Sequence, residues 1–199
     1  FSDLTTGVAE LRSHIASQHP DLPVVLIGHS MGGLIAARTV LDAAPDYQTL
    51  ILTGPLLGVP TPPPAWQTWL LRTLSALFPS AKALEIDASA VSRDQAVVDD
   101  YVADPLVHHE NIPARTVVSL FDEASAVLGR ASEISLPTLL LHGEQDELTS
   151  VPASRQFMAD LSATDKHITV YPGMYHELFN EPEKEDIIRT CLDWIAARL

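Results

Sequence analysis

A strand, a sharp turn and a helix follow one another between residues 24 and 41, and this unit constrains the fold more than any other part of the sequence. Val24–Ile27 is an unbroken apolar run of mostly β-branched residues, which is typical of a strand buried on both faces of a parallel sheet. It ends in Gly28-His29-Ser30-Met31-Gly32-Gly33, and apolar residues at helical spacing follow, namely Leu34, Ala37, Val40 and Leu41. A buried strand that leads at once into a helix predicts a parallel sheet wound by helices.

The same alternation returns towards the C-terminus. We predict further strands at 49–53, 138–141 and 167–171, and helices at 152–161 and 184–198. The middle of the chain breaks this rhythm, because it starts with a proline-rich segment and then shows helical patterns without an obvious strand, at 65–78, 92–101 and 114–130. At 199 residues with 46% apolar content the chain has enough core for one domain. We therefore expect a single α/β domain over residues 1–199, with a helical cap inserted at about 55–136.

Charge, hydropathy and cysteine content limit the partners and the location that we expect for this chain. The formal net charge is −14 and only 12 residues are Lys or Arg, so nucleic acid is not expected to bind. The most apolar region, Leu50–Phe78, is broken by prolines and Arg72, so we expect no transmembrane segment. Cys191 is the single cysteine, which forbids an intrachain disulfide and agrees with a cytoplasmic protein. A signal peptide ahead of Phe1 would change that expected location.

The segment Gly28-His29-Ser30-Met31-Gly32 fits the nucleophile elbow G-x-S-x-G. The turn is so sharp that we expect no room for side chains two positions before and after the serine, which would explain Gly28 and Gly32. It would raise the Ser30 hydroxyl above the sheet at the positive end of the next helix, where an oxyanion is stabilised. The backbone N–H of Met31 is then one expected oxyanion donor. The strand and helix on either side favour this elbow over an ordinary tight turn capped by a serine.

A serine hydroxyl needs a base to remove its proton, and the base needs an acid that holds it in one tautomer. In a parallel sheet we expect both groups in loops at the strand ends. The segment 172–177, Pro-Gly-Met-Tyr-His-Glu, follows the last predicted strand. Among eight histidines, His176 alone follows that strand on a glycine-containing loop, so we predict that His176 is the base.

The expected acid lies in the loop 142–147, which follows the predicted strand at 138–141. Asp146 competes there with Glu144 and Glu147, and spacing alone does not choose among the three. A charged loop is more often simply solvated, but its position at this edge of the sheet favours Asp146. The resulting order of nucleophile, acid and base along the chain agrees with that of α/β-hydrolases.

Other reactive side chains receive ordinary structural interpretations. His29 adjoins Ser30 in sequence, but neighbours across the elbow point apart, so we interpret it as structural. His108 and His109 lack a third ligand at a recognisable spacing. We expect neither a metal nor a cofactor. Cys191 lies among apolar residues of the last predicted helix and is expected to pack there rather than to react.

An apolar stripe runs along the first helix of the predicted cap. Its members repeat at helical spacing or adjoin the stripe: Trp66, Trp69, Leu70, Leu74, Leu77 and Phe78. The ordinary interpretation is that they form the core of the cap. The alternative is that some of them line a tunnel for an acyl chain or touch a lipid surface transiently.

Taken together, these motifs resemble the monoacylglycerol lipases and lysophospholipases of the α/β-hydrolase superfamily. The elbow alone indicates only the superfamily, whereas the cap segments Ser92-Arg93-Asp94 and 104–109 are similar to those of bacterial monoacylglycerol lipases. The resemblance also includes Leu141-His142-Gly143 with Asp146, and Met174-Tyr175-His176-Glu177. It implies a serine hydrolase that cleaves small lipid esters through an acyl-enzyme, with Ser30 as nucleophile, His176 as base, Asp146 orienting it and Met31 donating to the oxyanion.

The resemblance also implies features that this sequence does not contain. Four strands precede the elbow strand in that family, and the second oxyanion donor comes from a His-Gly loop after the third of them. We therefore expect the chain to be an N-terminally incomplete part of a longer enzyme, with the strand at 24–27 as an exposed apolar edge. The alternatives are another acyl hydrolase with the same triad, such as a peptidase, thioesterase or acyltransferase, or an inactive fragment with half an oxyanion hole.

Overall fold

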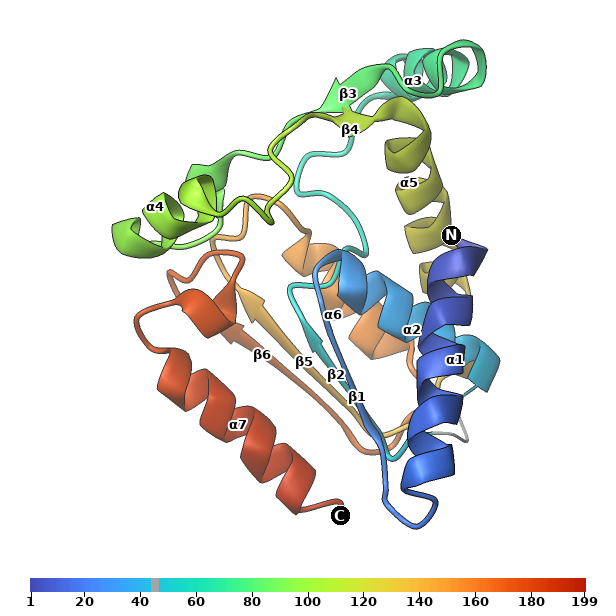
Figure 1. Cartoon of the computed structure of the whole chain (residues 1–199), viewed down its shortest axis with the longest axis vertical. Helices are drawn as coiled ribbons and strands as arrows, with labels where there is room; N and C mark the ends of the chain where they lie inside the picture. Colours follow the sequence, from blue (N-terminus) through green and yellow to red (C-terminus); the bar gives the residue numbers. More distant parts are fainter. Residues whose placement is uncertain (44–46) are drawn as a thin grey trace.

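Four parallel strands form the central sheet of the computed structural model, which describes residues 1–43 and 47–199. Their order is β1-β2-β5-β6, as Figure 1 shows. The strands are β1 (Val25–His29), β2 (Thr49–Thr53), β5 (Thr138–Gly143) and β6 (Lys166–Tyr171). All four predicted strands are present, each within two residues of its predicted bounds. The predicted α/β-hydrolase arrangement of a parallel sheet flanked by helices is therefore confirmed.

Helices cover both faces of the sheet (Figure 1). One face carries α1 (Ser2–Gln18), α2 (Met31–Ala43), α5 (Ala114–Gly129) and α6 (Val151–Asp160), whereas α7 (Lys184–Ala196) packs on the other. Side chains of β2 alternate between the two cores, because Leu50 and Leu52 join the cluster with α2 and α6 while Ile51 joins the cluster with α7. This alternation is what a strand buried on both faces requires.

Cys191 lies on the buried face of α7, in the same core cluster as Ile187 and Leu178. Burial raises the pKa of its thiol to about 11. A thiol with so high a pKa is almost entirely protonated at neutral pH, and the thiolate is the reactive form. The predicted packing role of Cys191 is confirmed.

The segment between β2 and β5 differs from a purely helical cap in two ways. It contains α3 (Ala65–Leu77), α4 (Gln95–Ala103) and a short antiparallel pair, β3 (Lys82–Leu84) with β4 (Ile112–Pro113). The prediction that this segment lacks strands is therefore wrong, because the pairing joins residues far apart in the sequence and leaves no local pattern. Helix α5 is the second difference, since three of its five buried side chains belong to the main core beside α2: Leu120, Ala124 and Val127.

Strand β1 forms one edge of the described sheet, where it pairs only with β2. The side chain of Ile27 is 49% exposed there, as the sequence predicts for an apolar edge strand. Short 3₁₀ turns complete the chain at Ala88–Ala90, Ala131–Glu133 and Leu178–Asn180. Among the helices of residues 1–43 and 47–199, none has the length and apolar character needed to cross a bilayer.

Candidate active site

Ser30 occupies the sharp turn between β1 and α2 with a backbone φ of +53°. It is the only residue other than glycine with a positive φ in the described ranges, and this conformation costs a non-glycine residue about 1–3 kcal/mol. Two backbone hydrogen bonds of Ser30 hold the turn. The Ser30 N–H donates to the Thr53 carbonyl at 3.0 Å, and the Ser30 carbonyl accepts from the Leu56 N–H at 2.9 Å. The strained serine is therefore held by the end of β2 and by the segment that follows it.

Close packing explains two of the glycines around Ser30. A Cβ on Gly28 would lie 2.4 Å from the Gly32 carbonyl oxygen and 2.8 Å from the Ala36 Cβ, and a Cβ on Gly33 would lie 2.8 Å from the Pro55 Cβ. A Cβ on Gly32, by contrast, would meet no described atom within 4 Å. The expectation that a clash requires Gly32 is therefore wrong, and the close contact falls one residue later.

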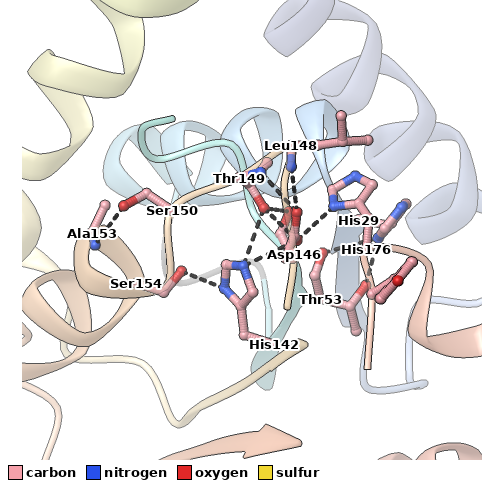
Figure 2. A network of polar contacts seen from close by, with 12 residues as sticks. His29, Thr53, His142, Asp146, Leu148, Thr149, Ser150, Ala153, Ser154 and His176 are labelled. Atoms are coloured by element: carbon pink, nitrogen blue, oxygen red, sulfur yellow. Dashed lines mark hydrogen bonds and ion pairs between the residues drawn. The ribbon is translucent and has the colours of Figure 1, made fainter. Parts of the chain in front are cut away.

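Asp146 and His176 lie together in the two loops that follow β5 and β6 (Figure 2). The His176 Nδ1 lies 2.7 Å from Asp146 Oδ2, and both side chains are buried. Glu144 and Glu147, which compete with Asp146 in the sequence, are exposed, and neither bonds to His176 within the described residues. The structure thus pairs the predicted base with one of its three candidate acids.

Hydrogen-bond donors surround the Asp146 carboxylate. Oδ1 accepts from the Leu148 and Thr149 backbone N–H groups, each at 2.8 Å. Oδ2 accepts from the Thr149 hydroxyl at 2.8 Å, and His142 Nε2 lies 3.1 Å from it. Burial is the largest single influence and raises the pKa of Asp146, but the hydrogen bonds from His142 and His176 together with the His176 charge outweigh it, so that the pKa lies well below its usual range. Asp146 is therefore held as a carboxylate.

His29 contacts the predicted base, which the sequence does not indicate. Its Nδ1 lies 3.0 Å from both the carbonyl and the hydroxyl oxygen of Thr53, and its ring centroid lies 4.8 Å from that of His176. Burial is the main cause that lowers the pKa of His29, and the neighbouring His176 lowers it further. A neutral His29 therefore packs beside His176 and anchors the elbow to β2.

The end of β2 connects the Ser30 turn to the edge of the sheet where Asp146 and His176 lie. Thr53 binds the Ser30 N–H, and the next residue, Gly54, lies against the acid–base pair. A Cβ on Gly54 would lie 3.2 Å from His176 Nδ1 and 3.3 Å from Asp146 Oδ2, and the φ of Gly54 is +47°. Within the described residues the Ser30 hydroxyl makes no side-chain hydrogen bond. Serine and histidine hydrogen bonds in free enzymes are often long and shorten when substrate binds.

Residues 1–183 match the Hydrolase_4 family, described as serine aminopeptidase, S33. The chain belongs to this family. It is 35% identical over 200 residues to a monoacylglycerol lipase of Mycolicibacterium smegmatis, covering 99% of this chain and 71% of that protein. It is 30% identical over 203 residues to a human monoglyceride lipase, covering 99% of this chain and 67% of that protein.

A solved structure agrees with these sequence matches. The crystal structure of a monoacylglycerol lipase of Paleococcus ferrophilus superposes with a TM-score of 0.87 at 27% identity, covering 98% of this chain and 74% of that one. The predicted resemblance to monoacylglycerol lipases is therefore confirmed. The chain is a lipase-like carboxylic ester hydrolase of the α/β-hydrolase fold.

In this Hydrolase_4 chain the cap is tied to the loop that carries His176. The buried carboxylate of Glu181 accepts hydrogen bonds from the Arg93 backbone and guanidinium and from the Tyr175 N–H, the last at 3.3 Å. The Glu177 N–H donates to the Val91 carbonyl at 2.8 Å. The cap segment that resembles bacterial monoacylglycerol lipases therefore braces the residues on both sides of His176.

The remaining candidates lie away from this site. His108 and His109 are exposed, and the His109 ring packs edge-on to Tyr101 with centroids 5.8 Å apart. Across residues 1–43 and 47–199 no group of three or more His, Cys, Asp or Glu side chains is arranged to hold a metal ion. Sequence reasoning misses the network that supports Asp146, because no spacing pattern shows which polar side chains of the loop after β5 and of α6 turn towards the carboxylate. The members of that network are His142, Thr149 and Ser154.

Proposed function

We propose that the chain hydrolyses monoacylglycerols or similar lipid esters, such as lysophospholipids, through an acyl-enzyme on Ser30. The observation that carries this proposal is the buried 2.7 Å contact between Asp146 and His176 at the sheet edge where the strained Ser30 turn lies. Relatives named as monoacylglycerol and monoglyceride lipases support the substrate class.

The proposed reaction has two halves. His176 takes the Ser30 hydroxyl proton while the serine oxygen bonds to the ester carbonyl carbon, and the oxyanion that forms accepts a hydrogen bond from the Met31 N–H. Met31 is the first residue of α2, where N–H groups have no intrahelical acceptor. The carbon–oxygen bond to the alcohol then breaks as His176 returns the proton to the leaving oxygen. Water, deprotonated by His176, releases the fatty acid and restores Ser30.

A substrate panel tests this function. The full chain is expected to hydrolyse a monoacylglycerol with a kcat/KM at least about tenfold above that for an aminoacyl arylamide. The reason is that the relatives matched over 99% of the chain are named as monoacylglycerol and monoglyceride lipases. Release of fatty acid and of arylamine measures the two rates. The family description names a serine aminopeptidase, so a higher rate on the arylamide would overturn the lipid-ester proposal and support a peptidase.

The exposed face of α3 supports contact with a lipid surface. The stripe expected to form the cap core is exposed at every position except Leu74, with Trp66 at 64% and Trp69 at 67%. That expectation is therefore wrong. Helix α3 lies at the outer end of the molecule, far from α7 (Figure 1). Indole rings favour the boundary between water and lipid, and the net charge of −14 favours zwitterionic over anionic lipid.

Replacing both Trp66 and Trp69 by alanine is expected to lower hydrolysis of monoacylglycerol in phosphatidylcholine vesicles by about tenfold. Hydrolysis of a water-soluble acetate ester should stay within about twofold, because α3 contributes none of the groups that hold Ser30, Asp146 or His176. Leu192→Ala, on the exposed face of α7, is the matched control and should change neither rate. Equal loss on both substrates would contradict the proposed surface.

A further inference from the structure

His142 is a second histidine at the acid, and nothing in the proposed reaction uses it. It lies on β5 directly before Gly143, and its side chain is fully buried. Both ring nitrogens have partners. Nδ1 lies 2.9 Å from the Ser154 hydroxyl, and Nε2 lies 3.1 Å from Asp146 Oδ2 and 3.2 Å from the Thr149 hydroxyl. Figure 2 shows the chain of contacts from Ser154 through His142 to Asp146.

The atoms in contact with the His142 ring require a hydrogen on Nε2. Asp146 Oδ2 is a carboxylate oxygen and only accepts, so an unprotonated Nε2 at 3.1 Å would place two lone pairs against each other. Ser154 is both donor and acceptor and satisfies Nδ1 through its hydroxyl. His142 therefore donates to the same carboxylate oxygen that His176 contacts.

We propose that His142 is a positioning residue, which fixes the Asp146 carboxylate in the orientation that receives His176. Oδ1 is held by two backbone N–H groups, and Oδ2 is held by His142 and Thr149 on the side away from His176 (Figure 2). The Thr149 hydroxyl also lies 3.1 Å from the Gly54 carbonyl. The carboxylate is thereby prevented from turning about its own axis. This inference rests on the proposed roles of Asp146 and His176.

Loss of the contact between His142 and Asp146 is expected to change kcat rather than KM. His142 lies behind Asp146 and is 0% exposed, so a substrate bound at Ser30 would not contact it. Alignment of Asp146 matters most when His176 becomes positively charged during proton transfer, and an interaction realised only in the transition state changes kcat. Loss of the supporting hydrogen bond is expected to lower kcat by about tenfold to a hundredfold, the effect typical of residues that orient the ligands of a catalytic metal from behind.

Two amide variants separate positioning from packing. In His142→Gln the amide nitrogen replaces Nε2 and the amide oxygen can accept from Ser154, so kcat should stay within about threefold. In His142→Asn the same amide is one methylene shorter, reaches Ser154 and withdraws the donor from Asp146, so kcat should fall by about tenfold or more with KM unchanged. His167→Leu, at an exposed position on β6, is the control for loss of a histidine. Thermal unfolding of each variant measures any loss of stability.

Two rates are measured on the full chain, the hydrolysis of monoacylglycerol and the phosphonylation of Ser30 by a fluorophosphonate. The second rate needs the triad but not the natural substrate. If the wild-type chain reacts with the probe and leaves monoacylglycerol intact, the substrate proposal fails, and the probe rate alone decides the role of His142. Equal rates for His142→Gln and His142→Asn, or a change confined to KM, would overturn the inference. A slower His142→Asn, restored in His142→Gln, would support it.

Discussion

Ser30→Ala is expected to lower kcat for ester hydrolysis by at least about 10⁴-fold, because no other group can form the proposed acyl-enzyme. The change removes a hydroxyl that makes no hydrogen bond among the described residues. The strained backbone, held by Thr53 and Leu56, stays the same. The melting temperature is therefore expected to stay within about 3 °C of the original. Steady-state hydrolysis and a thermal melt measure the two quantities.

An exposed serine provides the control for this variant. Ser132→Ala, in the turn at 131–133, is expected to keep both activity and stability, because Ser132 is exposed and its turn carries none of the proposed catalytic residues. A Ser30→Ala protein that retained more than about 1% of the original kcat would show that another nucleophile performs the reaction.

Asp146→Asn is expected to lower kcat by about 10⁴-fold and also to destabilise the fold. The kinetic loss arises because an amide no longer fixes the tautomer of His176 or stabilises its positive charge. The loss of stability arises because every neighbour of the carboxylate is a donor, so the new NH₂ group faces either two backbone N–H groups or the hydrogens of Thr149, His142 and His176. A buried donor without an acceptor costs about 1–3 kcal/mol.

The same loop provides the matched control for Asp146. Glu147→Gln removes one negative charge at an exposed position next in sequence, so kcat is expected to stay within about twofold of the original. Kinetic assays and denaturant unfolding of both variants measure the effects. A Glu147→Gln protein as impaired as Asp146→Asn would show that the charge of the loop matters rather than the contact with His176.

Local sequence patterns predict the elbow well because its structure is local. The apolar run at 24–27, the glycines and the apolar helix spacing are close together in the sequence, and the strand, turn and helix occur where expected. His176 is likewise predicted from its place after the last strand. Spacing does not choose among Glu144, Asp146 and Glu147, because the choice depends on which carboxylate is buried against a histidine 30 positions away.

Features that depend on long-range packing leave no signal in the sequence. His142 and Thr149 are close to Asp146 in the sequence, but contacts with Ser154 on α6 and with the Gly54 carbonyl after β2 hold their side chains in place around the carboxylate. The clash at Gly33, in place of Gly32, depends on Pro55, which follows β2. The apolar stripe of α3 has the spacing of a buried helix face but is exposed, since spacing does not distinguish a face that packs on protein from one left open.

Covalent labelling of the full chain with a fluorophosphonate, followed by mass spectrometry of its peptides, tests the central claim most directly. A serine that a buried Asp146–His176 pair activates should react stoichiometrically, with the added mass confined to the peptide that contains Ser30. Labelling should be absent in Ser30→Ala and strongly slowed in Asp146→Asn. A wild-type chain that takes up no probe, or that carries the added mass on another residue, would contradict the assignment of Ser30 as the nucleophile.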